Sequence, residues 1–127
     1  CQMMVLSGAF SASSSGFLSR ELSTPLVKVE LARFSDGEIK VKIPVALQGD
    51  VILLHSLAAP VNERLMELLL MLDAARRAGA QNLTAVVPYL SYSRQDRCTY
   101  DHGPISASLI ARLLESSGLN RLIVCDL

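Results

Sequence analysis

Residues 51–87, VILLHSLAAPVNERLMELLLMLDAARRAGAQNLTAVV, set out a strand, a long helix and a second strand in chain order. The first seven of these residues are almost wholly apolar, which is typical of a strand covered on both faces of a sheet. Pro60 and Asn62 begin a helix in which leucines recur at helical spacing, and Gly79 is the natural residue to end it. Residues 83–87 are apolar again, so the stretch predicts two parallel strands joined by a right-handed helical crossover.

Segments on either side of this stretch extend the alternation of strands and helices. Residues 104–117 predict a second helix with a proline in its first turn, and residues 122–127 predict another apolar strand. Before the stretch, residues 3–6 predict a first strand and residues 17–22 predict a short helix. The sequence therefore predicts an α/β protein built on a parallel sheet, and its 127 residues suffice for one domain.

The N-terminal third also contains an antiparallel pattern. Residues 26–32 and 39–45 alternate between apolar and polar side chains, as half-buried strands do. Residues 34–38, Phe-Ser-Asp-Gly-Glu, have the composition of a turn, so the segment predicts a hairpin. A plain hairpin turn accounts for Asp36 and Gly37. An aromatic ring beside two carboxylates could instead stack on a base and accept hydrogen bonds from its amino group, and the hairpin could equally be an oligomer contact.

The composition limits the kind of partner that the chain can have. Half of the residues are hydrophobic and 19% are charged, which indicates surface that is buried against another domain or subunit. The 12 basic and 12 acidic side chains give a net charge of zero, which argues against nucleic acid or an acidic membrane. No apolar run is long enough to span a bilayer. Three cysteines without a paired spacing predict neither a disulfide framework nor a zinc site, and they favour a reducing cytoplasm.

A polar loop after the second strand is the strongest candidate for a binding site. In an open parallel sheet, ligands bind beyond the carboxyl ends of the strands, and residues 56–59, residues 89–103 and Asp126 all fall at that edge. The longest of these segments contains four consecutive polar side chains: Arg94, Gln95, Asp96 and Arg97. A forked guanidinium can grip phosphate oxygens in pairs, and an amide can read the edge of a base. A solvated loop with weak Arg–Asp pairs is the plain alternative.

Single residues offer weaker signals. Asp126 is a candidate magnesium ligand, since Mg²⁺ prefers hard oxygen ligands. His102 could contact a phosphate when protonated, whereas His55 lies inside an apolar strand and is interpreted as a core histidine. Cys98 has no base at motif spacing and is interpreted as incidental. The glycine-rich GxGxxG and Walker A cradles are absent, as is the pair of acids before Thr-Gly-Thr that a phosphoribosyl pyrophosphate site needs.

Six groups of short motifs occur in a specific order. They are Phe34-Ser35-Asp36-Gly37-Glu38, Ala59-Pro60-Val61-Asn62 with Leu65-Met66-Glu67-Leu68-Leu69, Asp73-Ala74-Ala75-Arg76-Arg77-Ala78, Pro88-Tyr89 with Tyr92-Ser93-Arg94-Gln95-Asp96-Arg97, Pro104-Ile105-Ser106-Ala107, and Asp126-Leu127. With these motifs in this order and spacing, the chain from about residue 26 to residue 127 resembles the amino-terminal half of the ribose-phosphate diphosphokinase (phosphoribosyl pyrophosphate synthetase) family.

The resemblance implies a fold and an activity. The fold would be phosphoribosyltransferase-like, a three-layer parallel sheet with helices on both faces and an antiparallel hairpin. Residues 1–127 would form the amino-terminal domain, incomplete and without the second catalytic domain. Members of the family transfer diphosphate from ATP to ribose 5-phosphate, with Mg²⁺, to make phosphoribosyl pyrophosphate for nucleotide biosynthesis. They are homo-oligomers that build each ATP site across a subunit boundary.

The resemblance also implies site residues. Phe34, Asp36, Gly37 and Glu38 would hold adenine from a neighbouring subunit. The home subunit would hold the nucleotide through a second set: Arg94, Gln95, Asp96, Arg97 and His102. Asp126 would lie beside magnesium. No residue of this chain is expected to be catalytic, because phosphoryl transfer depends mainly on positioning and charge neutralisation.

The segment after Arg97 departs from the family pattern. Where the family usually has further lysines and arginines, this chain has Cys98-Thr99-Tyr100-Asp101-His102-Gly103. This loss of basic side chains leaves two alternatives to an enzyme open. The chain could belong to a non-catalytic paralogue that joins the enzyme's oligomer and regulates it, or it could be a stand-alone nucleotide-binding domain that ends at Leu127.

Overall fold

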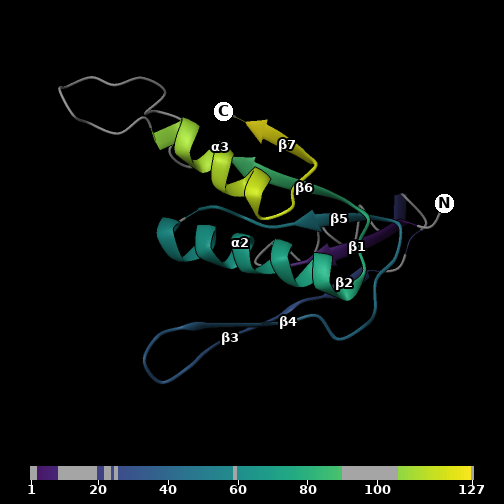
Figure 1. Ribbon diagram of the computed structural model, residues 1–127, viewed down its shortest axis with the longest axis horizontal. Helices are drawn as coiled ribbons and strands as arrows, with labels where there is room; N and C mark the ends of the chain where they lie inside the picture. Colours follow the sequence, from purple (N-terminus) through teal and green to yellow (C-terminus); the bar gives the residue numbers. More distant parts are fainter. Residues whose placement is uncertain are drawn as a thin grey trace.

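The computed structural model describes residues 3–8, 20–21, 24, 26–58, 60–89 and 106–126 of the chain. Within these residues, the elements form a five-stranded parallel sheet, a separate two-stranded antiparallel sheet and two long helices (Figure 1). The strands are β1 (Met3–Ser7), β2 (Leu26–Lys28), β3 (Glu30–Arg33), β4 (Ile39–Lys42), β5 (Asp50–Leu54), β6 (Asn82–Tyr89) and β7 (Arg121–Asp126). The helices are α2 (Val61–Ala78) and α3 (Ser106–Ser116).

Strand β5 lies at the centre of the large sheet, whose order is β2-β1-β5-β6-β7. Its Leu53 is in register with Leu6 of β1 on one side and with Ala85 of β6 on the other. Leu53 and Leu54 are both fully buried although neighbouring side chains of a strand point to opposite faces. The sheet is therefore covered on both faces at β5, which explains why this strand is apolar without alternation.

Helix α2 has the bounds that its sequence predicts. Pro60 is its N-cap residue, and Gly79 ends it with a φ of +118° while donating its N–H to the Arg76 carbonyl oxygen at 3.1 Å. One stripe of the helix packs into the core through four fully buried apolar side chains: Leu68, Met71, Leu72 and Ala75. Each of the larger side chains contributes roughly 1.5–3 kcal/mol by leaving water, so tertiary packing is the main support of the helix.

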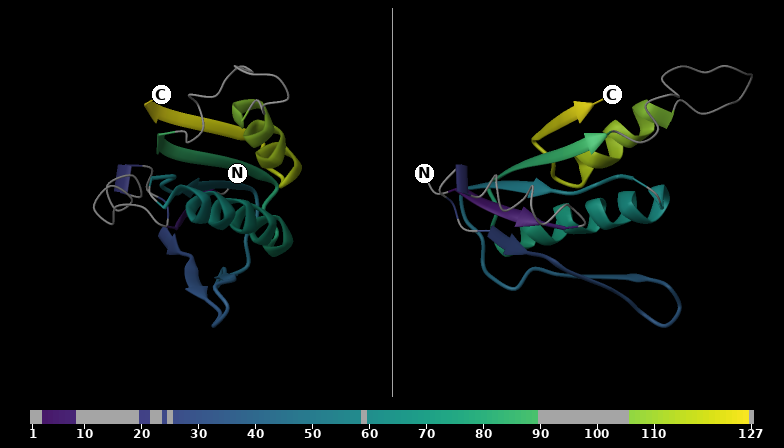
Figure 2. Two further views of the ribbon diagram at one scale, coloured as in Figure 1. Left: turned by 90° about the vertical axis from the view of Figure 1, so that its left-hand side faces the viewer. Right: turned by 180° about the vertical axis from the view of Figure 1, so that it is seen from behind.

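Both helices lie on the same face of the large sheet (Figures 1 and 2). This follows from topology, because β5, β6 and β7 are added in one direction along the sheet and right-handed crossovers then put α2 and α3 on one side. The connection from β1 to β2 steps in the opposite direction along the sheet. The short helix predicted for residues 17–22 belongs to that connection and lies almost wholly outside the described residues.

The predicted hairpin is present, but its first strand is shorter than the sequence predicts. Residues 26–32 do not form one strand, because β2 pairs in parallel with β1 and β3 pairs antiparallel with β4. The change of partner occurs at Val29, which is buried and donates its N–H to the Ser7 carbonyl oxygen at 2.9 Å. The hairpin β3–β4 forms its own small sheet and packs beside α2.

Strands β4 and β5 end at Lys42 and Leu54, each three residues before the end that the sequence predicts. The remaining elements agree with the prediction to within about two residues, the usual uncertainty of element ends. The predicted strands at residues 3–6, 83–87 and 122–127 correspond to β1, β6 and β7, and the predicted helix at residues 104–117 corresponds to α3. The mostly parallel sheet with helices and a separate antiparallel hairpin is thus confirmed. Neither α2 nor any other helix of the described part is both long enough and apolar enough to cross a bilayer.

Candidate functional site

The turn between β3 and β4 presents an aromatic ring and two carboxylates at the surface. The Phe34 N–H donates to the Glu38 carbonyl oxygen at 2.8 Å, and the Gly37 N–H donates to the Phe34 carbonyl oxygen at 2.9 Å. The Asp36 side chain accepts the Glu38 N–H at 3.0 Å, so one carboxylate shapes the turn itself. Gly37 has a φ of +95°, which only glycine adopts without strain. Phe34 is 50% exposed, and its ring is therefore available for stacking.

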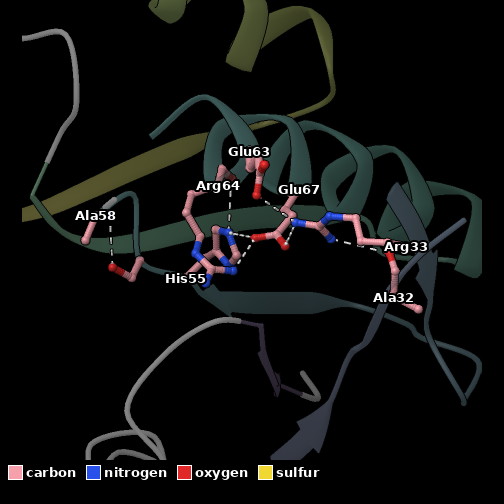
Figure 3. A network of polar contacts seen from close by, with 8 residues as sticks. Ala32, Arg33, His55, Ala58, Glu63, Arg64 and Glu67 are labelled. Atoms are coloured by element: carbon pink, nitrogen blue, oxygen red, sulfur yellow. Dashed lines mark hydrogen bonds and ion pairs between the residues drawn. The ribbon is translucent and has the colours of Figure 1, made fainter. Parts of the chain in front are cut away.

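Arg33, directly before this turn, is anchored to helix α2. Its Nη2 donates to Glu67 Oε2 at 2.9 Å and lies 3.5 Å from Glu63 Oε2 (Figure 3). Glu67 is only 1% exposed, so its carboxylate is a buried charge at the junction between hairpin and helix. A buried charge is stable only when it is paired and hydrogen-bonded, and Arg33 provides one of the pairs.

The other carboxylate oxygen of Glu67 faces the large sheet. Glu67 Oε1 accepts a hydrogen bond from Arg64 Nη1 at 2.9 Å and lies 3.3 Å from His55 Nε2 (Figure 3). The same His55 nitrogen is 3.1 Å from the Arg64 carbonyl oxygen. A neutral imidazole with its proton on Nε2 can donate to these two acceptors. Figure 3 shows that Glu67 lies between His55 after β5 and Arg33 at the end of β3.

The charges of this network follow from burial and from the hydrogen bonds. Burial lowers the pKa of His55, so the ring is neutral at neutral pH despite the nearby carboxylate. Burial alone would raise the pKa of Glu67, but hydrogen bonds from Arg64 and Arg33 outweigh it and hold the pKa below its usual value. The hydrogen bond to Glu67 raises the pKa of Arg33. The buried centre of the network therefore contains the Glu67 anion and the neutral ring of His55, held by two cations, Arg64 and Arg33, and the exposed Glu63 adds a second carboxylate at its edge.

The end of β1 closes tightly over His55. Gly8 donates its N–H to the Leu54 carbonyl oxygen at 2.9 Å. A Cβ at Gly8 would lie 2.6 Å from His55 Nδ1 and 2.9 Å from Met71 Sδ, so only glycine fits there. His55 is fully buried, as its interpretation as a core histidine predicts.

The carboxyl edge of the sheet brings two predicted segments together. In the pairing of β6 with β7, Tyr89 is in register with Asp126, so the first residue of the segment 89–103 lies beside the candidate magnesium ligand. The side chain of Asp126 lies outside the described residues, as do the five predicted nucleotide-binding residues of the loop: Arg94, Gln95, Asp96, Arg97 and His102. In the part of the chain that the structure describes, no group of three or more His, Cys, Asp or Glu side chains could hold a metal ion.

Within one chain, the hairpin turn does not lie near this edge. In Figures 1 and 2, the turn at residues 34–38 and the end of β7 lie on opposite sides of the molecule, with α2 between them. The hairpin turn and the end of β7 are therefore separated by α2 within one chain.

Sequence reasoning did not identify the Glu67 network. Glu63 and Glu67 lie near the start of α2, where the helix dipole favours acidic residues, so the dipole alone could account for both in the sequence. The spacing of residues along α2 could have revealed that Glu67 is buried. Glu67, Met71 and Ala75 are four residues apart and therefore lie on the same buried stripe of the helix. A carboxylate on a buried stripe requires a cationic partner, and the chain supplies Arg64 and Arg33.

Comparison with known proteins supports the family resemblance that the sequence motifs indicate. Residues 3–118 match the family model described as the N-terminal domain of ribose phosphate pyrophosphokinase. The chain is 42% identical to ribose-phosphate pyrophosphokinase 1, chloroplastic, of Oryza sativa subsp. japonica, over 99% of this chain and 32% of that protein. It is 44% identical to the ribose-phosphate pyrophosphokinase of Helicobacter hepaticus, over 97% of this chain and 40% of that protein.

A solved structure supports the same assignment. The crystal structure of phosphoribosylpyrophosphate synthetase from Mycobacterium smegmatis matches with a TM-score of 0.89 and 34% identity, covering 98% of this chain and 42% of that chain. The chain thus spans about a third to two fifths of the proteins that it matches. Since the family model covers residues 3–118, well over half of the sequence, the chain belongs to the family of the N-terminal domain of ribose phosphate pyrophosphokinase.

Proposed function

We propose that this chain is the ATP-binding amino-terminal part of a ribose-phosphate diphosphokinase. The enzyme would transfer diphosphate from ATP to the anomeric hydroxyl of ribose 5-phosphate and so make phosphoribosyl pyrophosphate. The observation that carries the proposal is the family match over residues 3–118. The odd number of cysteines, without a CxxC spacing, supports a reducing compartment, the cytoplasm, for this reaction.

The hairpin turn would recognise adenine. The half-exposed ring of Phe34 offers a stacking surface, and Asp36 and Glu38 offer oxygens that accept hydrogen bonds from an exocyclic amine. Gly37 would allow the tight turn that places these side chains together. Because the turn lies far from the end of β7 in Figure 1, it would serve the ATP bound by a neighbouring copy in a homo-oligomer.

The loop at the carboxyl edge would hold the rest of the nucleotide. Arg94 and Arg97 would grip phosphate oxygens, Gln95 and Asp96 would orient the nucleotide, and His102 would add a weak phosphate contact. The oxygen chemistry of Asp126 fits Mg²⁺, which would neutralise phosphate charge when bound. These residues bind and orient ATP, and positioning of this kind supplies most of the catalysis in phosphoryl transfer.

Ribose 5-phosphate would be held outside residues 1–127. The sequence contains no acidic pair before a Thr-Gly-Thr loop, which is the pattern expected for that sugar phosphate. We therefore expect no turnover when the 127-residue chain is mixed with ATP, ribose 5-phosphate and magnesium. Product formation by this chain alone would contradict the assignment of the sugar site to another domain.

Nucleotide binding tests the loop directly. We expect Arg94→Glu to weaken ATP binding by at least about 30-fold in calorimetric titration, because losing a desolvated charge partner costs about 2 kcal/mol or more. Arg112→Glu is the matched control, since it changes the net charge equally and lies exposed on α3. Equal affinity of the Arg94→Glu variant and the parent would show that the loop does not hold ATP.

A regulatory paralogue is the second candidate, and the segment after Arg97 favours it. Cys98-Thr99-Tyr100-Asp101-His102-Gly103 contains no lysine or arginine, so the grip on a triphosphate would be weaker than in an active enzyme. The gene sequence beyond Leu127 separates the two candidates. A histidine followed later by an acidic pair with Thr-Gly-Thr supports the enzyme, and the loss of these residues supports the paralogue.

A further inference from the structure

The hairpin β3–β4 requires an external support. It forms a separate sheet of two strands, and a two-stranded hairpin is at best marginally stable by itself. Apolar side chains supply part of this support, because Leu31, Val41 and Ile43 are partly buried against the core. They do not reach the turn, whose residues 34–38 are all exposed. Among the described side-chain contacts between the hairpin and another element, those of Arg33 with Glu67 and Glu63 lie nearest to the turn along the chain.

We infer that Glu67 is a positioning residue that clamps the hairpin turn to helix α2 and to the end of β5. The inference rests on the proposed function in one respect, since it gives the clamp the role of presenting the turn to a nucleotide. It assigns to Glu67 no contact with ATP. It also explains why a carboxylate occupies the buried stripe of α2, where an apolar residue would pack at lower cost.

The geometry of the carboxylate supports the clamp. Glu67 Oε2 binds Arg33 of the hairpin at 2.9 Å, whereas Oε1 binds Arg64 of α2 at 2.9 Å and lies 3.3 Å from His55 after β5. The two oxygens therefore connect the hairpin, whose Arg33 is 34 positions from Glu67, to two consecutive elements, the end of β5 and helix α2 (Figure 3). Because Arg33 immediately precedes Phe34, the ion pair fixes the position at which the chain enters the turn.

The chain also contains an ion pair that joins two residues of the same helix and connects no separate elements. Arg77 Nε binds Asp73 Oδ2 at the same distance of 2.9 Å, but both residues are on α2 and both side chains are mostly exposed. An exposed pair within one helix contributes little. A comparison of Arg33→Met with Arg77→Met therefore isolates the effect of the clamp from the general effect of removing an ion-paired arginine.

Hydrogen exchange measured by NMR on the full 127-residue chain tests the clamp. In Arg33→Met we expect the amides of β3 and β4 to exchange about tenfold faster, while the Gly8 amide, which donates to Leu54, keeps its rate. Arg33→Lys should restore most of the protection, since an ammonium group can still pair with Glu67. Unchanged hairpin exchange in Arg33→Met, or the same change in Arg77→Met, would overturn the clamp.

Titration with ATP and magnesium tests the functional part separately. We expect Arg33→Met to bind ATP about tenfold more weakly and Arg77→Met to bind it as the parent does, because a mobile turn must be ordered on binding. Faster hairpin exchange with unchanged ATP affinity would establish the clamp and contradict the adenine role of the turn. Unchanged exchange with weaker ATP binding would contradict the clamp and leave the proposed function standing.

Discussion

His55 illustrates how burial decides the charge of a side chain that titrates near neutral pH. Its Nε2 faces the Arg64 carbonyl oxygen and the Glu67 carboxylate, two acceptors that a neutral ring satisfies with one N–H. Burial lowers its pKa, and the adjacent Glu67 only partly opposes this. Protonation would add a third positive charge to a network that already contains Arg64 and Arg33.

The lowered pKa predicts a loss of stability in mild acid. The unfolded chain binds a proton at His55 near the ordinary value of 6.5, whereas the folded chain resists it. The neutral His55 therefore contributes its full share to the free energy of unfolding above this pH. Below it, the free energy of unfolding falls by up to about 1.4 kcal/mol per pH unit for a single proton. We expect urea denaturation at pH 7.5 and pH 5.5 to show a smaller loss for His55→Gln than for the parent.

The difference between the parent and His55→Gln isolates the titration of His55, because other titrating groups contribute to the unfolding free energy of both proteins. His102 is present in both proteins, and Glu67 has a pKa held below its ordinary value of 4.5, so its protonation affects stability only at lower pH. The glutamine side chain keeps an N–H that can reach the Arg64 carbonyl oxygen. Equal losses of unfolding free energy in the two proteins would show that His55 does not titrate differently on unfolding.

At the scale of elements, the strand–helix–strand order could be predicted because each signal is local. Residues 51–57 are almost wholly apolar, Pro60 and Gly79 delimit α2, and proline and glycine likewise flank α3. Residues 26–32 show the limit of such patterns. Alternation reports which face of a strand is buried, and it continues through Val29 although the chain changes partner there from β1 to β4. Strand pairing depends on distant residues, which a local pattern does not contain.

The Glu67 network could not be found by motif for the same reason. Arg33 and Glu67 are 34 positions apart, and they meet only because the hairpin folds back beside α2. The turn at residues 34–38 was predicted correctly as a turn because its composition is local. Its assignment to adenine, like that of Arg94 and Asp126 to phosphates and magnesium, stays a prediction.

Two glycines with positive φ provide a matched test of the connections between elements. At Gly37, with a φ of +95°, an added Cβ would meet nothing within 4 Å. At Gly79, with a φ of +118°, an added Cβ would lie 2.2 Å from the backbone oxygen of Leu47, which cannot move freely because the Leu47 N–H donates to the Ala78 carbonyl oxygen. The same substitution therefore adds backbone strain at one site and adds both strain and a steric clash at the other.

We expect Gly37→Ala to lower the free energy of unfolding by about 1 kcal/mol, the usual order of the left-handed penalty. Gly79→Ala should cost about 3 kcal/mol or more, because overpacking against the backbone is added to the strain. Urea denaturation of both variants provides the comparison. If the two substitutions cost the same, the close approach between the end of α2 and Leu47 is absent in solution.

At the scale of the whole molecule, apolar side chains remain at the surface in several places. Val45 beyond the hairpin is 43% exposed, Ile123 on β7 is 44% exposed and Leu109 on α3 is 45% exposed. Ile123 also lines a hollow of about 430 Å³ together with Met3 and other residues of the large sheet. The expectation that another domain or another copy covers part of this apolar surface stays a prediction.

The similar exposure of these three residues permits a controlled test of self-association. We expect the chain to associate through the hairpin and the face of the large sheet, so that Val45→Thr and Ile123→Thr shift the molar mass measured by light scattering toward that of the monomer. Each substitution should weaken association by roughly 1 kcal/mol, since it removes part of a buried apolar contact. Leu109→Gln, on the helical layer, should leave the mass unchanged. A parent chain that is monomeric at high concentration, or a mass that responds only to Leu109→Gln, would exclude the hairpin and the sheet face as the surfaces through which copies meet.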